Sequence, residues 1–244
     1  MVVFLTSSPC DDAPEGVDLP FVFKEENEFI ANMKKYYKAD SNCLLICADP
    51  DAYDYNDRMA WEYWQAFAYH GMIYEDMFVL DERNASEAEQ LLQNCTMIIL
   101  AGGHVPTQNT FFTEIGLREK LQQFSGVIMG ISAGSMNSAD MVYAMPEREG
   151  ESVDPEYQKF VKGLGLTDIN ILPHYQMVKD WVLDGKRLYE DIGFEDSMGQ
   201  CFYVLVDGSY VMVTEKENTL YGEAHLLSDG SMDQICTWGN KVKI

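Results

Sequence analysis

Short apolar runs alternate with amphipathic stretches through the first half of the chain, and this alternation constrains the fold more than any other feature. The apolar runs are Val2–Ser7, Asn42–Ala48, Met72–Leu80, Thr96–Leu100 and Gly126–Ile131. The stretches with helical spacing are Glu25–Lys38, Tyr55–His70, Ser86–Gln93 (opened by a serine cap) and Pro106–Phe124. Strands that are apolar on both faces must be covered on both faces, and connecting helices bring successive strands parallel. The pattern therefore predicts an α/β fold with a mostly parallel sheet and helices on both of its faces.

The second half of the chain has a different pattern. The segment Asp140–Asp168 is acidic and weakly periodic, which predicts a long connection, and Ile169–Leu172 predicts one more strand. Between Cys201 and Trp238, short strands are separated by turn signals at Asp207-Gly208 and Asp229-Gly230. We therefore expect C-terminal β-hairpins.

The charge of the chain excludes some classes of partner. There are 17 basic and 40 acidic residues, a formal net charge of −23. Such a chain repels phosphate backbones and anionic lipid, so we expect neither a nucleic-acid nor a membrane partner. No apolar run approaches the roughly 20 residues that span a bilayer, and no signal peptide follows Met1. The six cysteines lack zinc-site spacing. We expect a cytoplasmic protein of one domain, residues 1–244, with no metal and no cofactor.

One short motif carries a specific chemical signal. The segment Gly130-Ile131-Ser132-Ala133-Gly134 fits the pattern G-x-S-x-G and stands between a predicted strand and a helix. A residue in such a turn adopts a strained conformation that pushes its side chain outward, and the glycines remove Cβ atoms that would collide. Ser132 is therefore the candidate nucleophile of a serine hydrolase.

A serine nucleophile needs a general base, and histidine is the usual one. The four histidines are His70, His104, His174 and His225. His174 follows a predicted strand in a turn fixed by Pro173, so we expect it at the same edge of the sheet as Ser132. His225, in the predicted hairpins, is its competitor, whereas His70 ends a predicted helix.

The base in turn needs a carboxylate that holds its tautomer. Asp207 follows an apolar strand and precedes Gly208, where its carboxylate can be partly buried and directed at a ring. An Asp-Gly turn is the simpler interpretation of the same residues. Glu147 and Asp168, in the long connection, are weaker candidates for this role.

An oxyanion hole needs two convergent N–H donors. The N–H of Ala133, next to Ser132, is one candidate. The other is Gly103, because the Gly102-Gly103 pair ends the strand that precedes the nucleophile strand. His104 follows directly, and a wall or substrate contact suits it.

Four short segments together are similar to one known family. They are Ala101-Gly102-Gly103, Gly130-Ile131-Ser132-Ala133-Gly134-Ser135, Leu172-Pro173-His174-Tyr175 and Val206-Asp207-Gly208. In this order they resemble peptidase E, the aspartyl dipeptidase family related to cyanophycinase. The resemblance covers about residues 1–225. It implies a class I glutamine amidotransferase-like fold and a serine peptidase that hydrolyses short peptides, with Asp-X dipeptides as the family's substrates.

The resemblance also implies roles for single residues. The family's nucleophile falls on Ser132, its histidine on His174, its oxyanion glycine on Gly103 and its acid on Asp207, where peptidase E has a glutamate. Peptidase E also has asparagine where this chain has His104. The basic residue that receives the substrate aspartate has no clear match, and Arg187 is the nearest candidate by context. Glutaminases of the same fold use cysteine at the elbow, so serine disfavours release of ammonia from glutamine.

Two other functions fit parts of the pattern. An α/β-hydrolase esterase would use Ser132, Asp207 and His225, in that fold's chain order, but it leaves His174 without a role. A non-catalytic protein could use the same pocket to bind a small molecule or peptide, but the complete set of serine, histidine and acid disfavours it.

Overall fold

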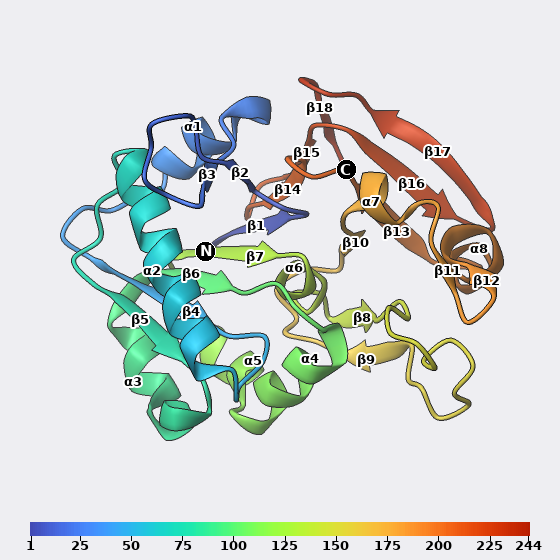
Figure 1. Ribbon diagram of the computed structural model, residues 1–244, viewed down its shortest axis with the longest axis horizontal. Helices are drawn as coiled ribbons and strands as arrows, with labels where there is room; N and C mark the ends of the chain where they lie inside the picture. Colours follow the sequence, from blue (N-terminus) through green and yellow to red (C-terminus); the bar gives the residue numbers. More distant parts are fainter.

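A central sheet of eight strands organises the protein, which we describe from a computed structural model of residues 1–244 (Figure 1). The strands, in spatial order, are β18 (Lys241–Lys243), β15 (Asn218–Tyr221), β14 (Tyr210–Val213), β1 (Val2–Thr6), β7 (Val127–Ile131), β6 (Cys95–Leu100), β4 (Asn42–Ile46) and β5 (Met77–Leu80). The five strands from β1 to β5 in this order are parallel, whereas β14, β15 and β18 add antiparallel pairs at one side. The predicted mostly parallel sheet is confirmed.

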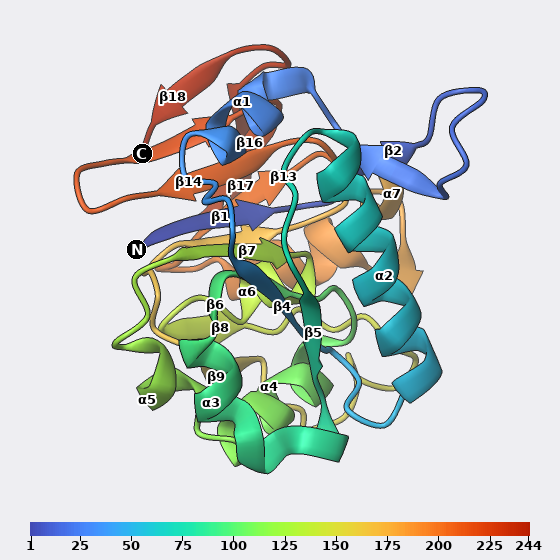
Figure 2. The same ribbon diagram turned by 90° about the vertical axis from the view of Figure 1, so that its left-hand side faces the viewer.

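Helices cover both faces of this sheet (Figure 2). On one face lie α1 (Phe29–Lys34) and α2 (Tyr53–Tyr69), and on the other lie α3 (Ala88–Gln93), α4 (Val105–Glu114), α5 (Leu117–Leu121) and α6 (Ala133–Met136). Successive residues of a strand point to opposite faces, so Phe4 packs with the first group of helices and Leu5 with the second. Each face therefore has its own apolar core, as the unbroken apolar runs predict.

A second sheet of four strands lies beside the first. Its order is β10 (Asn170–Leu172), β13 (Cys201–Leu205), β16 (Ala224–Ser228) and β17 (Ser231–Cys236). The first two strands are parallel and the others antiparallel. The Asp229-Gly230 turn joins β16 and β17 as a hairpin, as predicted. The hairpin predicted at Asp207-Gly208 is wrong, because that turn carries the chain from β13 to β14 in the other sheet.

Several predicted boundaries shift in the structure. The long helix from Pro106 to Phe124 is divided into α4 and α5 at Gly116, which has a φ of +60°. The helix predicted to start at Ser86 starts at Ala88, after a 3-10 turn (Glu82–Glu87) whose cap is Asp81. Of the strand predicted over Met72–Leu80, only Met77–Leu80 forms. The helix predicted over Glu25–Lys38 is shorter and consists of a 3-10 turn (Glu26–Glu28) followed by α1.

The remaining elements are short. They are β2 (Cys10–Asp12), β3 (Phe21–Phe23), β8 (Met141–Tyr143), β9 (Phe160–Lys162), α7 (Tyr175–Val178), β11 (Val182–Leu183), β12 (Lys186–Arg187), a π-helix (Leu188–Gly193) and α8 (Phe194–Asp196). The pair β8–β9 thus interrupts the predicted long connection. No helix is both long and apolar enough to cross a bilayer.

Candidate active site

Ser132 occupies a sharp turn between β7 and α6. Its backbone has φ +49° and ψ −111°, a strained conformation that costs about 1–3 kcal/mol and that the surrounding contacts must impose. A Cβ at Gly130 would lie 2.7 Å from the Cα of Ser135, and one at Gly134 would lie 2.2 Å from the carbonyl oxygen of Leu100. Both glycines are therefore required for this turn to pack against its neighbours.

His174 faces Ser132 from the second sheet. It follows β10 and precedes α7, with a left-handed backbone (φ +60°). Its Nε2 lies 3.0 Å from Ser132 Oγ and its Nδ1 lies 2.7 Å from Asp207 Oδ1. With its proton on Nδ1, the ring donates to the carboxylate and leaves Nε2 as the acceptor for the serine hydroxyl.

Asp207 lies in the turn that follows β13, the parallel neighbour of β10, with Val206 between them. Besides His174, its carboxylate accepts hydrogen bonds from Ser7 Oγ at 2.6 Å and from Gln176 Nε2 at 2.6 Å. Burial alone raises the pKa of Asp207, but the hydrogen bonds from His174, Ser7 and Gln176 outweigh it and leave the pKa below its usual range. The carboxylate is therefore ionised at neutral pH, as an orienting acid must be.

Sequence reasoning missed Ser7 and Gln176. Ser7 follows β1, and Gln176 stands two residues after His174 in α7. Gln176 contacts Asp207 twice, since its Oε1 also accepts from the Asp207 N–H at 3.1 Å. The small polar residues at the end of the first apolar run were the available signal for Ser7, because parallel strands end at the same edge of a sheet.

His225 does not compete for this position. It lies on β16, where its ring packs at 4.7 Å from the ring of Tyr175 and its buried Nδ1 has no hydrogen-bond partner. Burial lowers the pKa of His225, and the ring contacts neither Ser132 nor Asp207. The esterase arrangement is therefore not assembled in this structure.

Of the two predicted oxyanion donors, one follows Ser132 directly in the chain and the other shares its cleft. Ala133 is the first residue of α6, so its N–H has no partner inside that helix. Gly103 lines the same cleft as Ser132, and its N–H makes no hydrogen bond within the chain. A Cβ at Gly103 would lie 2.5 Å from the Cβ of Ala48, so only glycine fits here without a shift.

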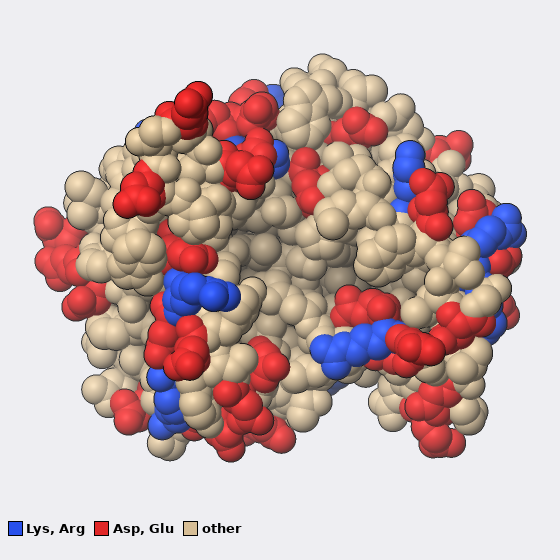
Figure 3. Space-filling model, viewed as in Figure 1, with Lys and Arg blue, Asp and Glu red and all other residues tan.

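A cleft of about 660 Å³ opens in front of Ser132 and His174. One wall comes from α2 and includes Tyr55, Met59 and Tyr63, whereas the opposite wall is polar. In Figure 3 the middle of this face is hollowed and lined mainly by uncharged side chains, with acidic groups around it. This volume is in the range of small-molecule sites.

His104 forms part of the polar wall, where the sequence predicted it. Its Nδ1 lies 2.7 Å from Thr107 Oγ1 and its Nε2 lies 2.8 Å from Glu151 Oε1. The other oxygen of Glu151 accepts the backbone N–H groups of Glu147 and Arg148 at 2.9 and 3.0 Å. His104 thus ties the segment 147–151 to the rim of the cleft.

Glu147, the weaker candidate for the orienting acid, also belongs to this wall. Its carboxylate lies 3.9 Å from His104 and has no contact with His174. Burial raises the pKa of Glu147, against the opposing effect of His104. Asp207 holds the place beside His174 instead.

Arg187 is not where the resemblance implied. It lies on β12, outside the lining of the cleft, and its guanidinium is paired with Asp191 at 2.6 Å. The only Lys or Arg that lines the cleft is Arg148, whose guanidinium forms no ion pair within the chain. The ion pair with Asp191, four residues further along the chain, holds the Arg187 guanidinium on the surface and away from the cleft.

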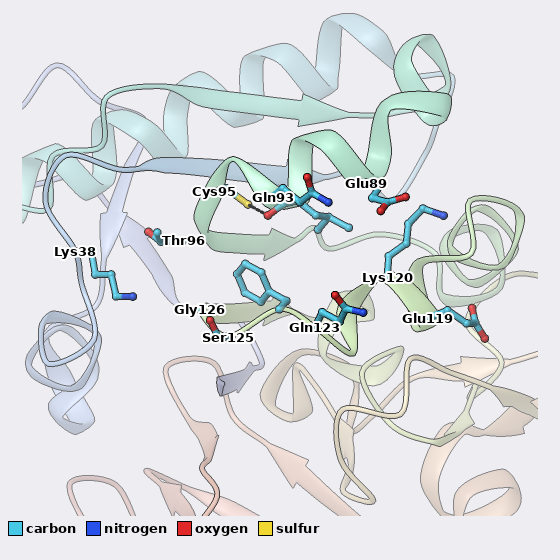
Figure 4. A pocket seen from close by; sticks show the side chains of 12 residues that line it. Lys38, Glu89, Gln93, Cys95, Thr96, Glu119, Lys120, Gln123, Ser125 and Gly126 are labelled. Carbon is cyan, nitrogen blue, oxygen red and sulfur yellow. Dashed lines mark hydrogen bonds between the residues drawn. The ribbon is translucent and has the colours of Figure 1, made fainter.

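A second hollow, of about 390 Å³, lies at the opposite edge of the central sheet (Figure 4). It lies where β6 and β7 begin, and Lys38, Glu89, Glu119 and Lys120 are among its lining residues. Its lining contains no histidine, and none of its side chains forms a nucleophile hydrogen-bonded to a base. Elsewhere in the chain, no three His, Cys, Asp or Glu side chains are grouped at metal-binding distance.

Comparisons with known proteins identify the family and the fold. Residues 25–221 match the description of peptidase family S51. The fold is similar to that of a peptidase from an acI-B1 actinobacterium, with a TM-score of 0.64 and 17% identity over 100% of this chain and 96% of the other. It is also similar to a putative peptidase E protein from Listeria monocytogenes EGD-e, with a TM-score of 0.59 and 12% identity over 96% of this chain and 98% of the other. No curated protein sequence matches the chain.

Proposed function

Because the chain belongs to peptidase family S51 and is a serine peptidase, we propose that Ser132, His174 and Asp207 form its catalytic triad. The observation that carries the proposal is the unbroken series of hydrogen bonds from Ser132 Oγ through the His174 ring to Asp207. No other histidine of the chain contacts a serine hydroxyl and a carboxylate in this way.

The geometry supports a two-step hydrolysis. Ser132 Oγ attacks the peptide carbonyl carbon while its proton passes to His174 Nε2, and Asp207 stabilises the resulting imidazolium. The N–H groups of Gly103 and Ala133 stabilise the oxyanion. When the C–N bond breaks, His174 gives that proton to the leaving amine and an ester to Ser132 remains. Water, deprotonated by His174, then cleaves the ester and releases the acid, which restores the serine hydroxyl.

Short peptides are the proposed substrates. The cleft is about as large as a small-molecule pocket, and the segment 147–151, fixed by the His104–Glu151 contact, walls one side of it. A folded protein chain does not pass easily through a site bounded in this way. The bounded cleft therefore supports a peptidase that hydrolyses short peptides and does not cleave within long protein chains.

We expect the purified protein to hydrolyse dipeptides and to leave denatured casein essentially uncut. The measurement is release of free amino acids from a panel of dipeptides, beside the appearance of casein fragments. Cleavage of casein at a rate comparable with the dipeptides would contradict the proposed substrate class. Absence of turnover on every peptide would favour the non-catalytic binding protein instead.

Arg148 is the proposed site for a substrate carboxylate. The chain carries a net charge of −23, so an unpaired guanidinium in the cleft is the one local cation that can attract an anionic group. The carboxylate can belong to an aspartate side chain, as in Asp-X dipeptides, or to the C-terminus of the dipeptide. Both would be recognised by the same charge-assisted hydrogen bonds.

Arg148→Ala is expected to raise KM for Asp-Leu by about 10- to 100-fold with little change in kcat, since a hydrogen bond to a charged group is worth about 1.5–3 kcal/mol. The measurement compares Asp-Leu, Asp-Leu amide and Ala-Leu. The substrate on which the variant and the wild type no longer differ identifies the carboxylate that Arg148 receives.

Arg58→Ala, which removes an exposed cation from α2, is the matched control and should leave KM unchanged. A rise in KM of the same size with Arg187→Ala, and none with Arg148→Ala, would return the role to Arg187 and contradict this assignment.

A further inference from the structure

Ser7 contacts all three residues of the proposed triad. It follows β1 directly and is completely buried (0% exposed). Its carbonyl oxygen accepts the Ser132 N–H at 3.0 Å, its hydroxyl lies 2.6 Å from Asp207 Oδ1, and the His174 N–H lies 2.7 Å from the same hydroxyl. No other residue outside the proposed triad contacts all three of its members by hydrogen bonds.

The direction of each hydrogen bond at Ser7 is fixed by its partners. The backbone N–H of His174 can only donate, so the Ser7 oxygen accepts it. The carboxylate of Asp207 is ionised and can only accept, so the single hydroxyl proton of Ser7 points to Asp207 Oδ1. The hydroxyl therefore connects the backbone of the base to the side chain of the acid in one defined orientation.

Ser7 also lies where the two sheets meet. Ser132 belongs to the central sheet, whereas His174 and Asp207 follow β10 and β13 of the four-stranded sheet. The turn after Asp207 is held to the same segment, because the Gly208 N–H donates to the Ser8 carbonyl at 2.8 Å. The segment after β1 is thus bonded on one side to the nucleophile turn and on the other to the base and the acid.

We propose that Ser7 is a positioning residue that keeps His174 and Asp207 aligned with Ser132 across the junction of the two sheets. The inference rests on the proposed triad. Without the hydroxyl, the N–H of His174, which itself has a left-handed backbone, loses its partner, and Asp207 Oδ1 keeps only the imidazole. The Asp207 carboxylate is then held only by the His174 ring on Oδ1 and by Gln176 on Oδ2. It can therefore shift together with the ring, and the distance from His174 Nε2 to Ser132 Oγ is no longer fixed.

Ser7→Ala is expected to lower kcat by about 10- to 100-fold, with KM within about twofold, because a displacement of about 1 Å in a catalytic group has an effect of this size. The second-order rate of labelling by a fluorophosphonate should fall by the same factor, since it reports the reactivity of Ser132 without peptide binding. Both rates are normalised to the folded fraction from circular dichroism. If the alanine variant does not fold, Ser7→Cys, which keeps the shape of the side chain with a larger atom and a weaker donor, should show a loss of the same kind.

Ser209→Ala is the matched control. Ser209 follows Gly208 in the turn that contains Asp207 and, like Ser7, is buried, but its hydroxyl has no hydrogen-bond partner. Loss of this hydroxyl should leave kcat and the labelling rate unchanged. A loss equal to that of Ser7→Ala would mean that any buried hydroxyl deletion here disturbs the site, and would overturn the specific role of Ser7.

A double-mutant cycle separates positioning from a general effect on structure. If Ser7 acts through Asp207 and His174, Ser7→Ala should cost much less in an Asp207→Asn background than in the wild type. If the loss of kcat in the double variant equals the product of the two single losses, the two residues act independently and the inference is overturned. A Ser7→Ala variant with wild-type kcat would overturn it as well. An Asp207→Asn variant that is itself fully active would instead refute the proposed triad, so the two failures are distinguishable.

Discussion

Ser132→Ala is expected to lower kcat by about five to six orders of magnitude, because the remaining rate then comes only from binding and from the oxyanion donors. The backbone of the turn is held by the flanking glycines and by the contacts of the Ser132 N–H with the Thr6 and Ser7 carbonyls, none of which needs the side chain. Thermal unfolding should therefore be close to that of the wild type. The measurement is dipeptide turnover under single-turnover and steady-state conditions.

Ser138→Ala is the control for this variant. Its hydroxyl is buried near the same turn, outside the lining of the cleft, and donates to the Gly134 carbonyl at 2.8 Å. It should retain activity within a few fold of the wild type. If Ser132→Ala keeps a rate within tenfold of the wild type, Ser132 is not the nucleophile and the proposed mechanism fails.

Asp207→Asn is expected to lower kcat by about 10⁴-fold, as in other triads that lose the acid's charge. An amide at this position no longer fixes the proton of His174 on Nδ1 and does not stabilise the imidazolium. The ring then places N–H rather than a lone pair toward Ser132 Oγ. The measurement is kcat for the dipeptide that the wild type cleaves fastest, with KM as the check that binding is retained.

His225→Ala provides the comparison for this prediction. The ring of His225 packs on Tyr175 and touches no member of the proposed triad, so kcat should change little. A loss of about 10⁴-fold in His225→Ala, with Asp207→Asn and His174→Ala nearly active, would reassign the base and restore the esterase interpretation.

The parallel core was predictable from sequence because its signal is local. A strand buried on both faces must be mostly apolar, and β1, β4 and β7 lie within the predicted runs, whereas β6 begins one residue earlier, at Cys95. The partner of a strand is not a local property, however. The residues around Asp207 indicate a turn, but whether that turn closes a hairpin or crosses to another sheet depends on the packing of β13 against β10.

The candidate site was predictable to the extent that its residues stand at strand ends. Ser132, His174 and Asp207 each follow a strand, and the structure brings their side chains within hydrogen-bonding distance. Ser7 also follows a strand and Gln176 lies close to His174, but serine and glutamine are common at the ends of elements, and only the tertiary contacts give them partners.

The basic residue of the cleft was likewise not predictable from local sequence. Arg187 was the nearest candidate by context, but it pairs with Asp191 and lies outside the lining of the cleft. Arg148 lies in the weakly periodic connection, where sequence predicts no structure. Its position in the cleft depends on the contacts of Glu151 with His104 and with the backbone of residues 147 and 148.

Mass-spectrometric localisation of a fluorophosphonate adduct identifies the nucleophile of this protein. The probe reacts with a serine whose hydroxyl is activated by a neighbouring base, so the wild-type protein should carry one adduct, on Ser132, and His174→Ala should be labelled far more slowly. Hydrolysis of dipeptides by a protein that carries no adduct, or an adduct on another residue while Ser132 remains unmodified, would exclude Ser132 as the nucleophile.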